Sequence, residues 1–209
     1  MARVIRLDDL DAIAVAGVNW RPVRRALGIT GFGVNAYTAD REGQLIEEHD
    51  EGGGGAGGHE ELYVVLAGHA RLTVDGAEID APAETFVFVG ETTSRRSAIA
   101  LADGTTVLVI GGASGTIKPS PWEYYFAALP AAEADEPGRA YEIAAEGLAA
   151  YPDNPSLHYN LACYASLAGD KERALEHLTR AFQGDPETRE WAATESDLDA
   201  IRSDPRYPR

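Results

Sequence analysis

The sequence predicts two domains of different class, an antiparallel β domain followed by an α-helical domain. Short runs rich in valine, tyrosine, phenylalanine and threonine fill the chain to about residue 112, and turn residues separate them. After residue 121 the chain is rich in alanine, leucine and glutamate, and its apolar residues recur at the helical period. Pro119 and Pro121 lie between these parts and would stiffen the connection.

The β part is expected to form a sandwich or a barrel, because its strands are short and closely spaced. The pairs Asp75-Gly76 and Asp103-Gly104 favour tight turns between neighbouring strands. Alternate side chains along each strand then point into the interior. The predicted strands lie in the runs GFGVNAYT, QLIEEH, ELYVVLAG, HARLTVDG, TFVFVG and TTVLVIGG.

The helical part contains a repeat. Small residues such as Gly169, Ala174 and Ala181 would let two helices approach closely, and Pro186 would end the second helix. This pattern resembles the tetratricopeptide repeat (TPR), and it recurs more weakly in the preceding stretch. We therefore place the β domain at 1–112, a linker at 113–120 and the helical domain at 121–209. Within the helical domain we expect repeats at about 121–153 and 154–186, followed by capping helices at 187–209.

Charge and composition restrict the classes of partner. The formal net charge is −16, so nucleic acid and anionic membrane surfaces are unfavourable partners. The single Cys163 excludes an intramolecular disulfide framework and a cysteine-rich zinc site. The apolar runs are too short to span a membrane, and the first residues lack the apolar core of a signal peptide. We expect a cytoplasmic protein.

A glycine-rich stretch stands between two histidines at the start of a predicted strand. From Gly43 the chain passes His49, Glu51 and Glu61 to reach Gly68. This order resembles the first motif of the cupin superfamily, G-x5-H-x-H-x3–4-E-x6-G. The resemblance implies a small β-barrel, the double-stranded β-helix, and places His49 and Glu61 at ligand positions. Glu51 replaces the second histidine, and the added glycines lengthen the loop.

The second cupin motif, G-x5-P-x-G-x2-H-x3-N, matches only in length. Glu84 occupies the position of the leading glycine, Gly90 that of the proline and Thr92 that of the second glycine. Arg95 replaces the last histidine, and Ile99 replaces the asparagine. An arginine stays positively charged in proteins, so it opposes a divalent ion at that position.

Three interpretations of the predicted site remain open. In the first, His49, His59 and Glu61 hold a divalent ion of iron, manganese, nickel or zinc, and Glu51 or Asp50 assists them. His59 joins this set because it stands two residues before Glu61 and, if it already lies in the strand, faces the same side. In the second, Arg95, or Arg96 one register away, pairs with Glu61 or Glu51 and replaces the metal. An empty barrel of that kind would bind a small, anionic molecule through the two arginines and the histidines. In the third, the domain is purely structural.

The leading functional expectation is a non-enzymatic protein. Its barrel would bind a small ligand or act as a scaffold, and its helical domain would associate with a protein or peptide partner. The cupin resemblance also implies a homo-oligomer, such as a homodimer. The alternative is a metal-dependent cupin enzyme, of dioxygenase or isomerase type, that acts on a small molecule. In either case the glycine-rich loop 51–60 is a candidate flap over the barrel mouth, because glycine adopts many backbone conformations.

Overall fold

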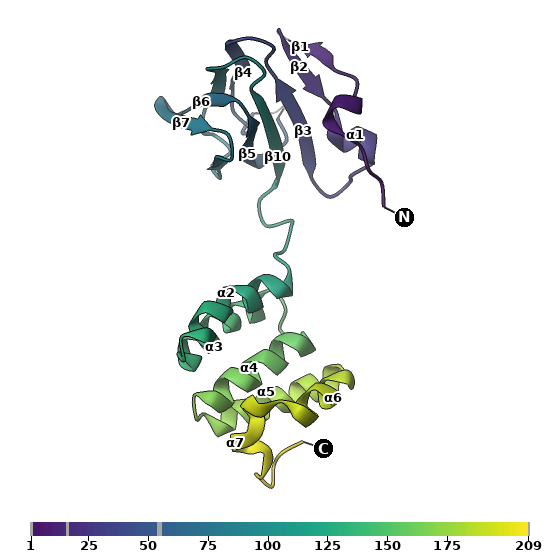
Figure 1. Ribbon diagram of the computed structural model, residues 1–209, viewed down its shortest axis with the longest axis vertical. Coiled ribbons are helices and arrows are strands. Elements are labelled where there is room, and N and C mark those ends of the chain that lie inside the picture. Colours follow the sequence, from purple (N-terminus) through teal and green to yellow (C-terminus); the bar gives the residue numbers. More distant parts are fainter. Residues whose placement is uncertain (1, 16, 54–55, 209) are drawn as a thin grey trace. The chain divides into compact units, whose positions relative to one another are not determined.

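The computed structural model describes residues 2–15, 17–53 and 56–208. They divide into two compact units, Met1–Ile117 and Lys118–Arg209. Figure 1 shows that the first unit is built of strands and the second of helices. Among the described residues, no helix combines the length and the apolar character that crossing a membrane requires.

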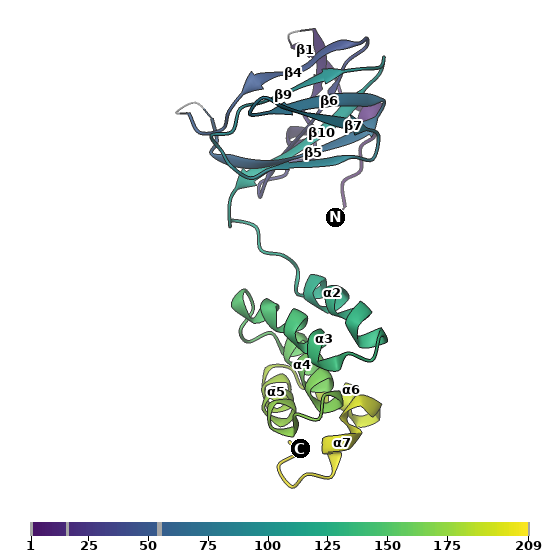
Figure 2. The same ribbon diagram turned by 90° about the vertical axis from the view of Figure 1, so that its left-hand side faces the viewer.

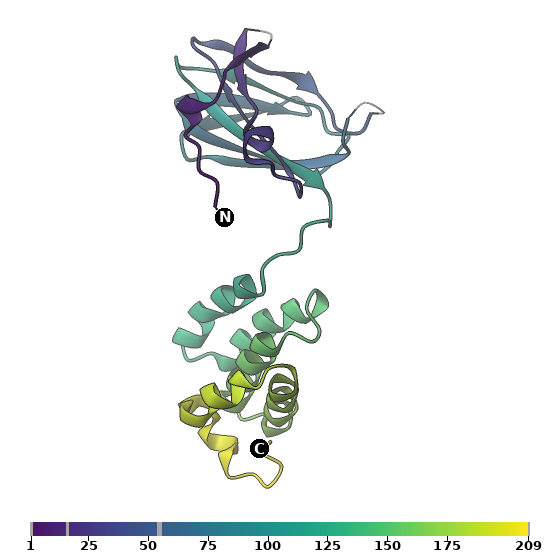
Figure 3. The same ribbon diagram turned by 90° about the vertical axis from the view of Figure 1, so that its right-hand side faces the viewer.

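The N-terminal unit contains two antiparallel sheets, seen from a second side in Figure 2. The six-stranded sheet has the order β1 (Ile13–Val15), β2 (Val18–Arg21), β3 (Gly33–Thr38), β10 (Thr106–Ala113), β5 (His59–Ala67), β8 (Phe86–Val89). The four-stranded sheet has the order β4 (Gly43–His49), β9 (Arg96–Ala100), β6 (His69–Val74), β7 (Ala77–Pro82). The short helix α1 (Val23–Leu27) packs against β3, as Figure 3 shows.

The inner faces of these sheets form one core. Tyr63, Val65 and Val107 from the larger sheet meet Leu45 and Leu72 from the smaller one, and each is almost fully buried. The alternation of buried and exposed residues along β5 explains this arrangement, because a strand directs successive side chains to opposite faces. The same alternation directs Glu61 and Tyr63 inward.

The closed barrel predicted from the sequence is wrong. The strands of each sheet pair only within that sheet, and among the described residues no hydrogen-bonded strand pair joins the two sheets. Closure requires every strand to pair on both sides. The edge strands β1 and β8 are three and four residues long, too short to continue the pairing across the gap.

The C-terminal unit is made of consecutive packed helices. They are α2 (Pro121–Glu133), α3 (Pro137–Ala145), α4 (Pro155–Leu167), α5 (Lys171–Gly184), α6 (Glu187–Thr194) and α7 (Asp199–Arg202). The Asn154 side chain caps α4 by accepting from the Leu157 amide, and Asp170 caps α5 through the Arg173 amide. Fully buried alanines lie where α3 and α4 approach their neighbours. The assignment of these helices to the tetratricopeptide family stays a prediction.

Two buried histidines connect α4 and α5. His158 Nε2 donates to Pro152 O at 2.8 Å, so its Nδ1 accepts from His177 Nδ1, also at 2.8 Å. His177 Nε2 accepts in turn from the Tyr141 hydroxyl at 2.9 Å. Every ring nitrogen therefore has a partner while both rings are neutral. Burial, followed by the neighbouring His158, lowers the pKa of His177 to about 4.

Acid should therefore destabilise the helical unit. The unfolded chain takes up a proton on His177 near its ordinary pKa, whereas the folded chain does so only near 4. We expect a loss of about 2–3 kcal/mol of unfolding free energy between about pH 7 and pH 4.5 from this residue. Urea unfolding followed by the helical circular dichroism signal measures it. His177→Gln should remove this part of the pH dependence, and an unchanged dependence would contradict the assignment.

Candidate functional site

A cavity of about 360 Å³ opens in the N-terminal unit where β4 and β5 approach the first two strands. Its described lining residues combine apolar side chains with several carboxylates and include no arginine or lysine. The apolar and aromatic lining residues are Val15, Val18, Tyr37, Leu45 and Ile46. The polar lining residues are Gln44, Glu47, Glu48, His49, Glu51 and Glu61. The cavity therefore favours neutral or cationic ligands over anionic ones.

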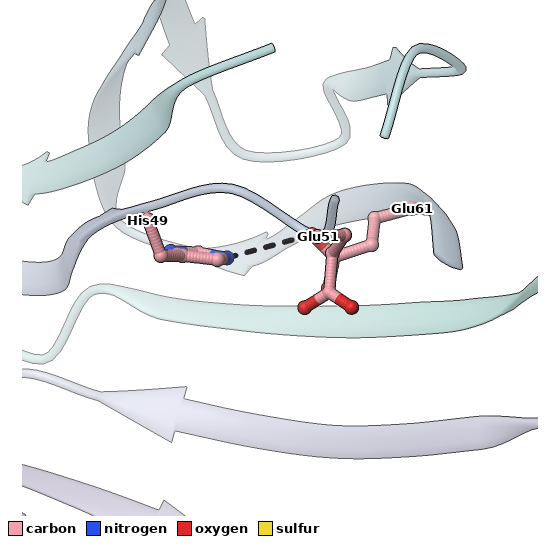
Figure 4. A group of neighbouring side chains, drawn as sticks. All are labelled: His49, Glu51 and Glu61. Atoms are coloured by element: carbon pink, nitrogen blue, oxygen red, sulfur yellow. Dashed lines mark ion pairs between the residues drawn. The ribbon is translucent and has the colours of Figure 1, made fainter. Parts of the chain in front are cut away.

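Three of the predicted site residues converge on this cavity. His49 ends β4, Glu51 follows two residues later, and Glu61 lies near the start of β5. Each of the three places one potential ligand atom within 4.8 Å of the others, and Figure 4 shows their side chains meeting. The dashed line in that view marks the pair between His49 Nε2 and Glu61 Oε2, which are 3.6 Å apart.

Glu61 is held by donors on several sides. Its Oε2 accepts from the Tyr63 hydroxyl at 2.5 Å and from Arg96 Nε at 3.0 Å. Burial raises the pKa of this carboxyl, but the contact with His49, the hydrogen bond from Tyr63 and the charge of Arg96 outweigh it and lower the pKa. Glu61 is therefore a carboxylate throughout the neutral range, although it is only 8% exposed.

Arg96 is the buried cation beside this carboxylate. Its side chain is 1% exposed, and it lies opposite His49 in the β4–β9 pair. One of its terminal nitrogens donates to Thr92 O at 3.1 Å and to Ser94 O at 2.7 Å. Arg96 thus fixes Glu61 and the turn before β9 at the same time.

His49 has one ring nitrogen anchored and the other directed at Glu61. Its Nδ1 lies 2.8 Å from Glu47 O and must donate there, because a carbonyl oxygen only accepts. In the neutral ring Nε2 then faces the carboxylate with a lone pair, and protonation turns this contact into a favourable one. Glu61 accordingly raises the pKa of His49, while partial burial opposes the shift. The side chain stays 34% exposed, so a ligand in the cavity can reach it.

The other predicted site residues lie around this group. His59 begins β5, and its Nδ1 is 3.7 Å from Glu51 Oε2. The same Glu51 oxygen accepts from the Gly57 amide at 3.0 Å, which ties the glycine-rich loop to the site. Arg95 is exposed and pairs with Glu48. Thus the structure brings His49, Glu51 and Glu61 together, places Arg96 behind Glu61, and leaves His59 and Arg95 outside the close group.

Sequence reasoning missed Tyr63 and Tyr37. Tyr63 is two residues from Glu61 on the same strand, so the period of a strand alone directs both side chains to one face. That signal was sufficient to add Tyr63 to the site. Tyr37 lines the cavity from β3, and no motif in the sequence marks it.

On distance alone, a divalent ion is possible at His49, Glu51 and Glu61, since imidazole and carboxylate are suitable ligands. The hydrogen bonds fit less well. Both lone-pair positions of Glu61 Oε2 already accept hydrogen bonds, and one of the donors is a permanent cation. The group therefore meets the spacing of a metal centre, but the Glu61 oxygen that faces His49 is already occupied by protein donors.

No family model and no curated protein matches the sequence. Solved structures similar to the chain include cupin proteins. KdgF from Halomonas sp. has a TM-score of 0.44 and 14% identity, over 53% of this chain and 93% of its own. A sugar phosphate isomerase of the cupin superfamily from Silicibacter pomeroyi has a TM-score of 0.44 and 17% identity, over 54% and 76%. A cupin protein from Bacteroides fragilis has a TM-score of 0.38 and 19% identity, over 54% and 91%. At these values the likenesses establish neither a family nor an activity for this chain.

Proposed function

We propose that the N-terminal unit is an enzyme that transfers protons to and from a small molecule, with His49 as the acid–base residue. One observation carries this proposal: the accessible His49 imidazole lies on the cavity wall, anchored at Nδ1 and facing a buried carboxylate at Nε2. Such an arrangement orients the ring and stabilises its protonated form. This function corresponds to the isomerase type of the enzymatic alternative, in place of a purely non-enzymatic domain.

The residues around His49 define how a proton would move. Neutral His49 takes a proton from the substrate at Nε2, and the imidazolium is stabilised by Glu61. Tyr63 and Arg96 keep Glu61 ionised and fixed, so it does not rearrange during the transfer. His49 then returns the proton to a neighbouring atom of the substrate. Loss of water balances with these two transfers, because His49 removes the proton next to the carbonyl and returns it to the leaving hydroxyl. Isomerisation of a sugar also moves the proton of the neighbouring hydroxyl to the carbonyl oxygen, which solvent water can carry, and neither reaction needs an oxidant.

The cavity lining narrows the substrate class. Glu47, Glu48, Glu51 and Glu61 line the cavity with His49, and the described lining residues include no arginine or lysine. The arginines that pair with Glu48 and Glu61 are not lining residues, so phosphates and carboxylates remain unfavourable. Tyr37 and the apolar wall would contact a ring or an alkyl part of the substrate. We therefore propose neutral or amino-bearing carbonyl compounds as substrates, such as sugars that open to an aldehyde or ketone.

Deuterium incorporation tests this function across the whole proposed class of substrates. The full-length protein is incubated in D₂O with a panel of neutral aldoses, ketoses and amino sugars, and carbon-bound deuterium is followed by NMR. We expect the wild-type protein to catalyse exchange of deuterium for a proton on the carbon next to the carbonyl of at least one compound. Absence of exchange across the panel would contradict the proposal and favour ligand binding without catalysis.

A second candidate function concerns the helical unit, where we infer a binding site for a peptide partner. A cavity of about 370 Å³ carries four aromatic side chains, Trp122, Tyr125, Tyr159 and Trp191, together with Asn160. Trp122 and Trp191 remain 61% and 43% exposed. Photo-cross-linking from position 160 tests this site. The cross-linked partner should be lost in Trp122→Ala and kept in Leu167→Ala, an exposed residue outside the cavity. Equal capture by both variants would contradict it.

The homo-oligomer and the cytoplasmic location also stay predictions. Light scattering of the full-length protein tests the first, and a single-chain mass would contradict it.

A further inference from the structure

We propose that Arg96 takes the place of a divalent cation in the N-terminal cavity, so that the site works without a metal ion. This inference rests on the proposed function, since it concerns the same site, and it states what neutralises Glu61 there. The close His49, Glu51 and Glu61 group by itself would suggest a metal centre. The surroundings of Arg96 point to an internal cation.

The position of Arg96 is the first argument. In the β4–β9 pair Arg96 stands directly opposite His49, so the two side chains belong to the same part of the site. Its Nε lies 3.0 Å from Glu61 Oε2, the same oxygen that faces His49 Nε2 at 3.6 Å. A positive charge is therefore already in contact with the carboxylate on which a bound ion would depend.

Arg96 is also fixed in place. Besides Glu61, it donates to Thr92 O and Ser94 O in the turn before β9, and its remaining nitrogen lies 3.5 Å from His59 O. Withdrawal of the side chain would leave these carbonyls without their donor and move a guanidinium that is 1% exposed. Arginine does not lose its proton in proteins, so the charge cannot be removed either.

The effect on a bound ion follows from distance. A divalent ion on Glu61 Oε2 would sit within about 5 Å of Arg96 Nε, because metal–oxygen bonds are about 2.1 Å long. Repulsion between a double and a single positive charge at that separation lowers the affinity by roughly 10-fold with the screening of bulk water and by roughly 10⁵-fold with the screening typical of a protein site. The oxygen also lacks a free lone pair, because Tyr63 and Arg96 both donate to it.

Glu51 has a separate structural contact that would compete with a metal. Its Oε2 accepts from the Gly57 amide and lies 3.7 Å from His59 Nδ1. The Glu51 backbone is held as well, since its amide donates to Thr92 O at 2.8 Å and its carbonyl accepts from the Gly58 amide at 3.0 Å. Both carboxylates of the group are thus engaged by groups of the protein.

Titration with a metal alone tests the inference independently of any activity. Chelator-dialysed full-length protein is titrated with Mn²⁺, and the ring signals of His49 are followed by NMR, where a nearby Mn²⁺ broadens them. In wild type we expect no selective broadening of His49 below about 1 mM. Arg96→Gln should bind Mn²⁺ at least about 100-fold more tightly than wild type. Arg95→Gln, which changes the exposed neighbour, should bind Mn²⁺ no more tightly than wild type.

Two outcomes would overturn the inference. Stoichiometric binding to wild type at micromolar Mn²⁺, with His49 broadened and the effect lost in Glu51→Gln, would show a metal centre. A folded Arg96→Gln that binds no more tightly than wild type would show that Arg96 is not what excludes the ion. If Arg96→Gln does not fold, the wild-type titration alone decides. Failure of the proton-transfer function would appear only in the deuterium experiment and leaves this titration valid.

Discussion

Replacement of Arg96 by methionine is expected to lower the unfolding free energy of the N-terminal unit by about 3–5 kcal/mol. The substitution leaves the Glu61 carboxylate buried without its cation, and it removes the donor to Thr92 O and Ser94 O. Urea unfolding read by hydrogen-exchange mass spectrometry measures the effect, because this method follows the two units separately.

The adjacent arginine provides a matched control for this substitution. Arg95 is 59% exposed and pairs with Glu48 at the surface. Arg95→Met should therefore lower the unfolding free energy of the N-terminal unit by less than about 1 kcal/mol. In addition, Arg96→Met combined with Glu61→Gln should be more stable than Arg96→Met alone, since the unpaired buried charge is gone. Equal costs for the two arginines, or a purely additive double variant, would contradict the proposed role of Arg96.

Replacement of His49 by alanine is expected to lower the deuterium-exchange rate by about 10²–10⁴-fold, the usual contribution of a general acid–base residue. The anchor at Glu47 O and the pair with Glu61 orient this ring, and alanine offers no group that accepts a proton. The rate is measured by NMR with whichever panel compound exchanges.

Two control variants separate catalysis from general damage. Glu78→Gln changes a carboxylate that pairs with Arg71 outside the cavity, and His69→Ala removes a histidine that pairs with Asp80 outside the cavity. Both should keep the rate within a few-fold of wild type. A His49→Ala rate within about 10-fold of wild type would indicate that another residue transfers the proton.

Local features of the β half were predictable from the sequence, because they depend on neighbouring residues. Asp75-Gly76 forms the turn between β6 and β7, with positive φ at both residues, as the dipeptide favours. The inward direction of Glu61 follows from the period of β5. The absence of barrel closure was not predictable in this way, since closure depends on pairing between edge strands far apart in the sequence.

The sequence could not show whether Arg95 or Arg96 points inward to Glu61, because this depends on the register of the strand pairing. Motif spacing assumes regular strand pairing, but the β4–β9 pair is irregular between Gln44 and Ile46 and again between Ile46 and His49. Each irregularity shifts which side chains face inward. The structure also places Glu51 near His49 and leaves His59 beside Glu51, which the motif spacing alone did not determine.

The proposed proton transfer depends on the His49–Glu61 pair, and an NMR titration of the His49 ring in chelator-treated full-length protein measures the strength of this pair. Glu61 raises the pKa of His49, so wild type should titrate above the ordinary histidine value of 6.5. In Glu61→Gln the carboxylate is absent and the His49 pKa should fall, whereas Glu48→Gln should leave it unchanged. A His49 pKa at or below the ordinary value in wild type, or one that Glu61→Gln does not lower, would contradict the proposed acid–base pair.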